Sequence, residues 1–249
     1  MIIGISGFIN SGKDTVADII CKAQLPGIMQ QNSIYAKHSF ADKLKDAVAL
    51  MYGWDRSLLQ GDTDRSREWR EETCPRWGVT PRKALQDVGV AMRGVDSDFW
   101  VKSLLTRFKN DSHVVIPDVR FPNEVDGIHE LGGIVIRVER GEQPEWVDII
   151  TDHEIKSTDD ADKVDQFLNE MGFPNIHESE WRMACNDVEF DVVIENGSDI
   201  ENLEHLIEHL LSIDFDLDKF GNQEDDKGVS ILDKPGTQLE LDLTGDDYR

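Results

Sequence analysis

Two glycines and a lysine near the N-terminus have the spacing of a loop that binds phosphate. Four residues separate Gly7 from Gly12, and Lys13 follows directly. Glycine lets a backbone turn its N–H groups toward an anion, and the lysine adds a mobile positive charge. A helix that begins near Gly12 would present the positive end of its dipole to the same anion. These features predict a polyphosphate site; the alternative is a glycine-rich turn without a ligand.

The residues after the lysine narrow this prediction. Loops of this kind usually carry Ser or Thr in the next position to hold magnesium, whereas here Asp14 comes next and Thr15 follows. This arrangement resembles the Gly-Lys-Gly-Thr variant of nucleoside monophosphate kinases, in which the nucleotide phosphates and water hold most of the magnesium. GTPases and motor ATPases become less favoured.

A second group of polar residues follows the strand expected at 113–117. Asp118 and Arg120 stand where a carboxylate can order magnesium-bound water and an arginine can reach a transferring phosphoryl group. Glu124 falls in the first turn of the next expected helix, where it could orient Arg120. The alternative is a helix-capping aspartate with a salt-bridged arginine.

A third group lies on one face of the helix expected at 81–92. Arg82, Gln86, Gly89 and Arg93 recur at helical spacing, and Lys83 lies beside them. Such a face could bind a phosphate and the edge of a base, with the glycine allowing close approach. A solvated polar face would give the same pattern.

The elements that would position these groups alternate between strand and helix. This order predicts an α/β fold with a five-stranded parallel sheet between two helical layers, and ligands at the carboxyl ends of the strands. The expected strands are about 2–6, 34–40, 113–117, 134–138 and 190–194, and the expected helices are about 12–23, 42–52, 81–92, 97–108, 122–131 and 199–211.

Three segments depart from this alternation. Residues 55–80 show little periodicity, and residues 142–180 form an acidic, partly helical insertion; either could close over a substrate. Residues 214–249 contain 11 acidic and 4 basic residues, which is typical of a flexible tail. We therefore expect one kinase-like domain over 1–213 and an acidic tail.

The net charge of −24 argues against direct binding of nucleic acid, which requires a basic surface. The cysteines, Cys21, Cys74 and Cys185, lack metal-ligand or redox spacing. Without a signal peptide or an apolar run long enough to span a membrane, we expect a cytoplasmic protein with no membrane contact.

Taken in order, these motifs resemble the bacteriophage-type deoxynucleoside monophosphate kinases of the P-loop kinase group. The resemblance covers about residues 1–211, interrupted by the insertion. It rests on Ser11-Gly12-Lys13-Asp14-Thr15, Ala41-Asp42-Lys43-Leu44-Lys45-Asp46-Ala47, Arg82-Lys83-x-x-Gln86-x-x-Gly89, Phe99-Trp100-Val101-Lys102, Asp118-x-Arg120-x-x-x-Glu124 and Glu195-Asn196-Gly197-Ser198.

The resemblance implies transfer of the ATP γ-phosphoryl group to a deoxynucleoside monophosphate (dNMP), with ATP and Mg²⁺ bound, in the host cytoplasm if a phage encodes the chain. It implies an ATP site at Gly7, Asn10, Ser11, Gly12, Lys13, Asp14, Thr15 and Arg140, and a catalytic group of Lys13, Asp118, Arg120 and Glu124. Magnesium would contact Asp14, Thr15 and Asp118 through water. The monophosphate site would comprise Arg82, Lys83, Gln86, Gly89 and Trp100. Trp100 could stack on a base or pack in the core, and we favour packing.

Other assignments stay open. Residues 177–180 and Arg182 could belong to a lid that carries a positive charge, or to a capped surface helix. Arg140-Gly141 could contact the nucleotide, or could form only a turn. Gln238–Leu243 resembles peptides that dock on the bacterial sliding clamp, although an edge strand has the same alternation. A homodimer is also open. The functional alternatives are another small-molecule kinase, of the phosphomevalonate or dephospho-coenzyme A kinase type, and a non-catalytic nucleotide-sensing module.

Overall fold

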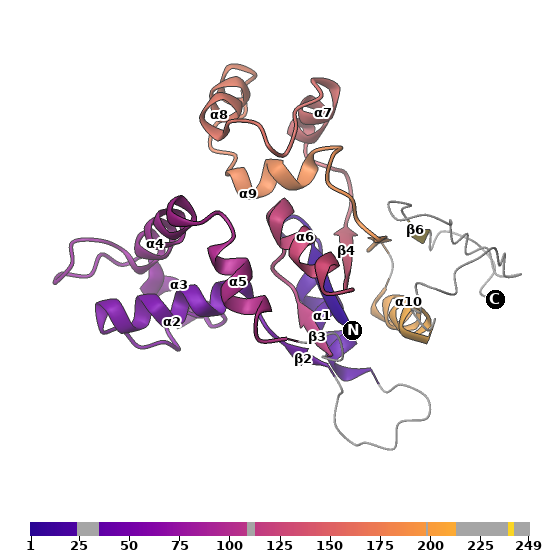
Figure 1. Ribbon diagram of the computed structural model, residues 1–249, viewed down its shortest axis with the longest axis horizontal. Coiled ribbons are helices and arrows are strands. Elements are labelled where there is room, and N and C mark those ends of the chain that lie inside the picture. The colour runs from indigo at the N-terminus through magenta and orange to yellow at the C-terminus, as the bar shows by residue number, and fades with distance from the viewer. Residues whose placement is uncertain (24–34, 109–112, 198, 213–238, 242–249) are drawn as a thin grey trace, which may run out of the picture. The chain divides into compact units, whose positions relative to one another are not determined.

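The computed structural model describes residues 1–23, 35–108, 113–197, 199–212 and 239–241. The chain divides into two compact units (Figure 1). The sheet unit comprises Met1–Lys37 and Asn110–Arg249, and the helical unit comprises His38–Lys109. The phosphate loop belongs to the first unit and the predicted monophosphate site to the second.

In the described part of the sheet unit, six parallel strands form one sheet in the order β2-β3-β1-β4-β5-β6. This confirms the predicted parallel α/β fold and adds one strand to it. The strands are β1 (Ile2–Ser6), β2 (Ala36–Lys37), β3 (Val114–Ile116), β4 (Ile134–Glu139), β5 (Val192–Glu195) and β6 (Leu239–Leu241).

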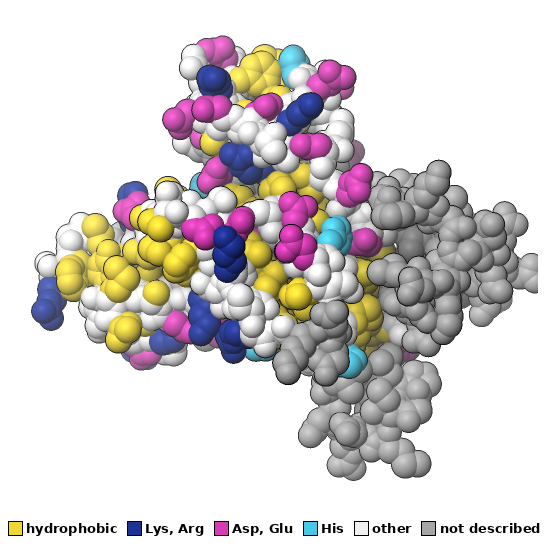
Figure 2. All heavy atoms as spheres, viewed as in Figure 1, with side chains coloured by type: hydrophobic (Ala, Val, Ile, Leu, Met, Phe, Trp, Pro, Cys, Tyr) yellow, Lys and Arg dark blue, Asp and Glu magenta, His cyan; other side chains and the backbone are white. Residues whose placement is uncertain are grey.

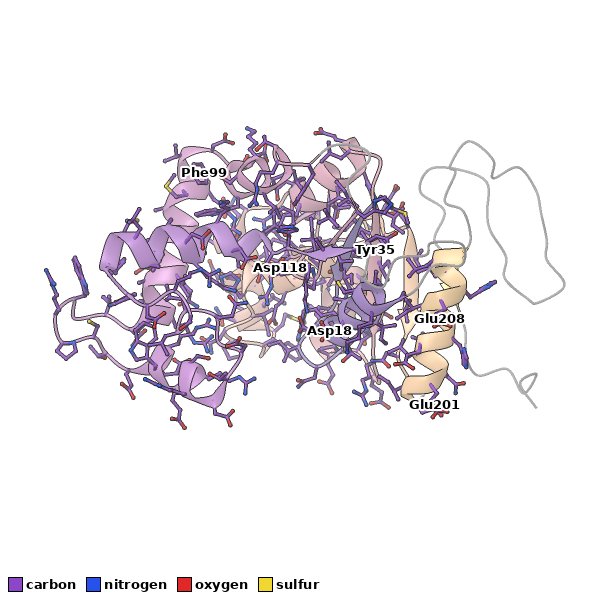
Figure 3. All side chains as sticks on the ribbon, turned by 90° about the horizontal axis from the view of Figure 1, so that it is seen from below. Asp18, Tyr35, Phe99, Asp118, Glu201 and Glu208 are labelled. Carbon is purple, nitrogen blue, oxygen red and sulfur yellow. The ribbon has the colours of Figure 1, made fainter. Side chains whose placement is uncertain are left out.

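Helices cover both faces of this sheet because alternate strand residues point to opposite sides. On one face, Ile3 and Ile5 of β1 pack in one apolar core with α1 (Lys13–Lys22) and α10 (Ile200–Ser212). On the other face lies α6 (Pro122–Glu130). Its Ile128 packs so closely on Gly4 that a Cβ on Gly4 would lie 2.6 Å from Ile128 Cδ1. The outer side of α10 exposes Glu201 and Glu208 (Figure 3).

The sixth strand comes from the acidic tail. Leu239–Leu241 pairs with β5 at the edge of the sheet, with Val192 opposite Leu239. The structure therefore favours the edge-strand interpretation for this tripeptide. Gln238 and residues 242–243 lie outside the described residues, as does most of 214–249, so clamp docking stays a prediction.

The insertion is helical and has its own buried centre. It contains α7 (Glu145–Asp152), α8 (Ala161–Glu170) and most of α9 (Glu178–Trp181), and in the structure it continues into the 3₁₀ turn η1 (Arg182–Ala184), which we include in it from here on. Trp181 is fully buried, and its indole N–H donates to Asp165 Oδ1 of α8 at 3.3 Å. Arg182 stacks on Trp181 and bonds to Glu178 and to the Ser157 carbonyl, so its charge is used within the insertion.

The helical unit packs its helices around Val48, Leu59, Ala84 and Leu85. Its helices are α2 (Phe40–Tyr52), α3 (Asp64–Glu71), α4 (Pro81–Val95) and α5 (Phe99–Leu105). Helix α3 lies within 55–80, where little periodicity was visible, and a capping box between Thr63 and Ser66 begins it. Figure 2 shows apolar side chains on the surface; the exposed ones in this unit include Leu50, Met51, Val90 and Val95.

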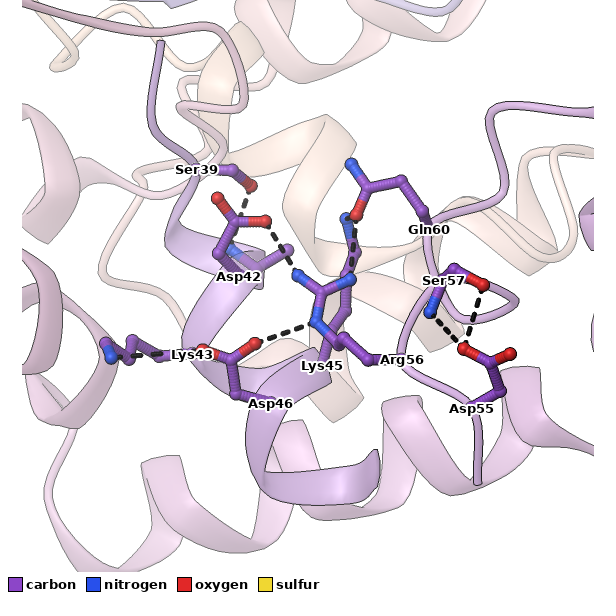
Figure 4. A network of polar contacts seen from close by, with 10 residues as sticks. Ser39, Asp42, Lys43, Lys45, Asp46, Asp55, Arg56, Ser57 and Gln60 are labelled. Carbon is purple, nitrogen blue, oxygen red and sulfur yellow. Dashed lines mark hydrogen bonds and ion pairs between the residues drawn. The ribbon is translucent and has the colours of Figure 1, made fainter. Parts of the chain in front are cut away.

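Hydrogen bonds and ion pairs, most of them made by one arginine, fasten the start of the 55–80 segment to α2 (Figure 4). Arg56 Nε lies 2.7 Å from Asp46 Oδ1, and its Nη2 lies 3.0 Å from Asp42 Oδ1. Its Nη1 donates to Gln60 at 2.9 Å. The motif at 41–47 thus supplies two carboxylates that hold this segment.

Within the described residues, no helix has the length and apolarity to cross a membrane.

Candidate active site

The phosphate loop has the backbone geometry that its glycines predict. Gly12 adopts a φ of 93° as the N-cap of α1, a conformation that disfavours any side chain. A Cβ on Gly7 would clash with Ser11 Oγ and lie 2.6 Å from the Val138 carbonyl oxygen. Asn10, at the exposed tip, also has a positive φ of 68°. The loop therefore connects β1 to α1 through a turn that needs glycine twice.

A residue after the last central strand holds this loop in place. The side chain of Asn196 is buried, and its Nδ2 donates to the Ser11 carbonyl oxygen at 2.8 Å. Its backbone N–H donates to the Glu139 carbonyl at 2.7 Å. A Cβ on Gly12 would clash with the same Nδ2. Asn196 belongs to the Glu195-Asn196-Gly197-Ser198 motif, and its contacts identify it as a support of the loop.

Two features of the loop suit an anionic ligand. Ser11 Oγ is buried and has no hydrogen-bond partner among the described residues, which is costly unless a ligand supplies one. The side chain of Lys13 is only 16% exposed, and its Nζ lies 3.6 Å from Asp14 Oδ2. A phosphate oxygen would give both groups a partner.

The loop borders a pocket in which cationic side chains predominate. Lys13, Arg120 and Arg137 line it, against Glu180 as the one carboxylate in the lining. The other lining residues come from β1, the phosphate loop, the segment after β3, and the α9–η1 segment: Ser6, Gly7, Phe8, Ile9, Val119, Ser179 and Met183. The pocket lies at the carboxyl ends of β1, β3 and β4, as expected for this fold.

The segment after β3 brings Arg120 to this pocket, and Glu124 fixes its backbone. Glu124 is buried, and its Oε2 accepts the N–H of Arg120 at 2.7 Å and of Phe121 at 3.1 Å. These contacts begin α6 in the manner of a capping box. Asp118 is half-buried on the same segment (Figure 3). Glu124 therefore acts on Arg120 through the backbone in this structure.

The predicted monophosphate residues lie on α4 and α5 in the helical unit. Arg82 and Lys83 are exposed and pair with Glu71 and Asp87, and Gln86 is exposed beside them. Gly89 is buried, with Leu44 3.4 Å from where its Cβ would be, and its carbonyl accepts the Trp100 indole N–H at 3.1 Å. Trp100 is 5% exposed, so its contacts support the packing interpretation.

A further arginine lies beside Arg82. Arg70 is half-buried, and its Nε has no hydrogen-bond partner among the described residues. Burial lowers the pKa of Arg70 from its ordinary value, and the neighbouring charge of Arg82 lowers it further, while Glu71 opposes both. A half-buried guanidinium group whose Nε lacks a partner, and on which a second arginine charge acts, suits an anion. Residue 70 fell in the aperiodic 55–80 segment, so its position was not predicted.

Comparison with known proteins gives the family. No protein-family model matches the chain. The crystal structure of TT1252 from Thermus thermophilus matches 85% of this chain and 96% of that chain at 21% identity, with a TM-score of only 0.39. A protein of Acanthamoeba polyphaga mimivirus, provisionally named a deoxynucleotide monophosphate kinase, is 32% identical over 157 residues, 56% of this chain and 74% of that protein. The chain belongs to this family of nucleotide kinases.

Few side chains beside the phosphate loop are of the kind that binds a metal ion. No group of three or more His, Cys, Asp or Glu side chains in the described part of the chain could hold a metal ion. Near the loop, Asp14 is 71% exposed and Thr15 half-buried, and Asp118 lies on the segment that carries Arg120. Magnesium keeps several waters and commonly uses one or two carboxylates with substrate phosphates, and the carboxylates of Asp14 and Asp118 are of this kind.

The pocket of the kinase also contains a residue that the motifs did not single out. Arg137 is 4% exposed in the carboxyl-terminal half of β4, a strand that is otherwise apolar up to Glu139. Charged side chains are almost never fully buried unless they are paired, and Arg137 Nε lies 3.4 Å from Glu139 Oε1. The sequence does contain a signal for this buried arginine, because Arg137 is a charged residue within an otherwise apolar run. Arg140, which the motifs did single out, is exposed just past the end of β4.

Proposed function

We propose that the chain is a deoxynucleoside monophosphate kinase, which transfers the γ-phosphoryl group of ATP to the 5′-phosphate of a dNMP. The observation that carries the proposal is the phosphate loop, in which the buried Ser11 hydroxyl has no hydrogen-bond partner among the described residues. Lys13 and Arg120 line the pocket that this loop borders. The name of the mimivirus relative supports a nucleotide as the acceptor.

In this reaction an oxygen of the dNMP 5′-phosphate attacks the γ-phosphorus. The bond between that phosphorus and the β–γ bridging oxygen breaks, and the electron pair leaves on ADP. The acceptor oxygen is already anionic near neutral pH, so no general base is required. The protein must align two anions and neutralise the charge that spreads over the equatorial oxygens.

The side chains of the sheet unit suit the donor half of this task. The loop backbone, Ser11 and Lys13 would bind the ATP phosphates, and Arg120 would neutralise charge on the transferring group. Asp14, Thr15 and Asp118 would hold Mg²⁺ partly through water, and the ion would offset the charge of the phosphates. Glu124 would keep Arg120 in place through the backbone contacts described above. Arg140 is a further candidate for contact with ATP.

The helical unit would supply the acceptor half. Arg82, with Arg70 beside it, would bind the dNMP phosphate, which would replace Glu71 as the partner of Arg82. Lys83 and Gln86 are exposed on the same helix and would contact the nucleotide. Gly89 and Trp100 would shape the site from behind, since both are buried.

The decisive experiment couples ADP release to the addition of ATP, Mg²⁺ and each of the four dNMPs, with AMP for comparison. We expect dNMP-dependent turnover that Lys13→Ala abolishes and Lys163→Ala, on the exposed face of α8, leaves unchanged. ATP binding without turnover on any nucleotide would refute the proposal and favour another acceptor or a sensing module.

A second experiment tests the acceptor site. Arg82→Met should raise the KM for the dNMP at least about tenfold and leave the dissociation constant of ATP unchanged, because one charged hydrogen-bonding partner is lost. Arg67→Met, which removes an exposed arginine from the neighbouring α3, is the matched control. Equal KM values for the two variants would remove Arg82 from the site.

A further inference from the structure

The buried Arg137 is held by groups from three different segments. It lies opposite Ser6 in the pairing of β4 with β1, so it belongs to the strand next to the phosphate loop. Its Nε lies 3.4 Å from Glu139 Oε1, and its Nη1 donates to the Met183 carbonyl at 3.3 Å. Burial lowers its pKa, with Glu139 opposing the shift. Burying this charge is costly, and the contacts with Glu139 and the Met183 carbonyl offset part of the cost.

The guanidinium group also stacks on the phosphate loop. Arg137 Cζ lies 4.2 Å from the ring centroid of Phe8 and 5.4 Å from that of Phe190. Phe8 makes a second ring contact with Trp146 of α7, at 5.2 Å between centroids and 71° between planes. The side chain of Phe8, which follows Gly7 in the phosphate loop, is therefore packed between β4 and the insertion.

This packing matters because the rest of the loop tip has little support from side chains. Ile9 is 72% exposed, and Asn10 is exposed in a left-handed conformation. A loop that binds phosphate through its backbone N–H groups gains affinity when its turn is formed before the ligand arrives. Phe8 is the loop side chain with partners on both sides, and Asn196 holds the other end of the loop through the Ser11 carbonyl.

We propose that Arg137 is a positioning residue that fixes Phe8 and thereby preorganises the phosphate loop for the triphosphate of ATP. Through Trp146 and the Met183 carbonyl, the same contacts join the loop to the insertion, which gives this helical segment a part in nucleotide binding. The inference rests on the proposed function insofar as the ligand is ATP.

The test measures ATP binding by calorimetry without an acceptor, and then steady-state kinetics with a dNMP. Arg137→Met should raise the dissociation constant and the KM of ATP about tenfold, a size between those of an exposed and a desolvated cation–π contact. The value of kcat at saturating ATP should stay within about threefold, and the KM of the dNMP should not change. Arg137→Lys keeps the charge without the planar stack, so it should lie between wild type and Arg137→Met.

Two further variants separate positioning from a general loss of stability. Phe8→Leu removes the aromatic face and keeps apolar bulk, and it should weaken ATP binding as Arg137→Met does. The double variant should be no weaker than the worse single variant, since both act through one contact. Lys163→Met, in the same unit, controls for the loss of one positive charge.

The outcomes discriminate clearly. A lower unfolding temperature for Arg137→Met with an unchanged dissociation constant of ATP would overturn the inference and leave a purely structural role. Should Arg137→Met not fold, Phe8→Leu and Arg137→Lys decide, and ATP binding equal to wild type in both would overturn it as well. Wild-type protein that binds ATP without phosphorylating a dNMP would refute the proposed function alone. Wild-type protein that does not bind ATP would refute both.

Discussion

Gly12 meets two constraints at once, and a pair of variants can separate them. Its φ of 93° is left-handed, and a Cβ there would clash with Asn196 Nδ2. Gly132 has a φ of 66° with no described atom within 4 Å of where a Cβ would lie, so Gly132→Ala measures the backbone cost alone, about 1–2 kcal/mol. Gly12→Ala should cost a further ~1–3 kcal/mol, because displacing Asn196 leaves the Ser11 carbonyl unsatisfied.

Urea denaturation of the two glycine variants gives both free energies of unfolding, and calorimetry gives ATP binding. We expect Gly12→Ala to lose ATP binding and Gly132→Ala to retain it. If both variants lost the same stability, the clash with Asn196 would have no energetic weight.

At the scale of residues, the sequence predicted the groups whose members lie close together in the chain, and it did not predict contacts between residues far apart in the chain. Gly7, Gly12 and Lys13 lie within one loop, so their spacing alone carried the information. The contact of Asn196 with Ser11 spans 185 positions, and no local pattern encodes it. The capping contacts of Glu124 were partly foreseen because its distance from Arg120 is short. The burial of Gly89 against Leu44 required knowledge of how α4 packs on α2.

At the scale of elements, a histidine and an aspartate join α6 to the sheet. His129 Nε2 lies 2.8 Å from Asp191 Oδ2, and the same oxygen accepts the N–H of Val135 at 2.6 Å. The hydrogen bond with Asp191 raises the pKa of His129 from its ordinary value of 6.5. The charges of Asp191, Asp126 and Glu189 act in the same direction, and burial opposes them.

The pH dependence of stability follows from the direction of this shift. Because the pKa of His129 is higher in the folded state, its contribution is fully present below about pH 6.5 and is lost as the pH rises through the folded pKa. His129→Gln should therefore lower the unfolding temperature most in acid, with the difference narrowing as the pH rises through the folded-state pKa. His205→Gln, on α10 with a side chain 82% exposed, is the control. A difference that does not vary with pH would assign the effect to packing.

The regular elements were predictable because each carries its own periodicity. All five expected strands are present, although β2 is shorter than predicted. Helix α3 was missed because it is short and highly charged, and it depends on its cap and on Trp69, which packs on the core of the helical unit. Strand β6 depends on pairing with β5, which lies far away in the sequence. Such elements are stabilised by tertiary contacts that a local pattern does not contain.

At the scale of the whole molecule, the net charge of −24 acts against the compact state. Exposed carboxylates repel one another, whereas ion pairs such as those of Arg56 with Asp42 and Asp46 attract. Under the proposed function, the anionic nucleotide must also approach an acidic protein, so the cationic pocket at Lys13, Arg120 and Arg137 would have to overcome the wider field. Salt screens all of these interactions, although with different consequences.

Added salt should therefore stabilise the fold and weaken ATP binding in the same protein. Raising NaCl from about 0.02 M to about 0.5 M shortens the screening length well below about 10 Å, which relieves the repulsion among carboxylates. We expect the unfolding temperature to rise by about 2–4 °C, equivalent to ~1 kcal/mol for a chain of this size. The dissociation constant of ATP should rise over the same range, because attraction to the pocket is screened too. Choline chloride should reproduce both effects if ionic strength is the cause. An unfolding temperature that falls with salt would mean that attractive pairs such as those of Arg56 outweigh the repulsion of the excess carboxylates.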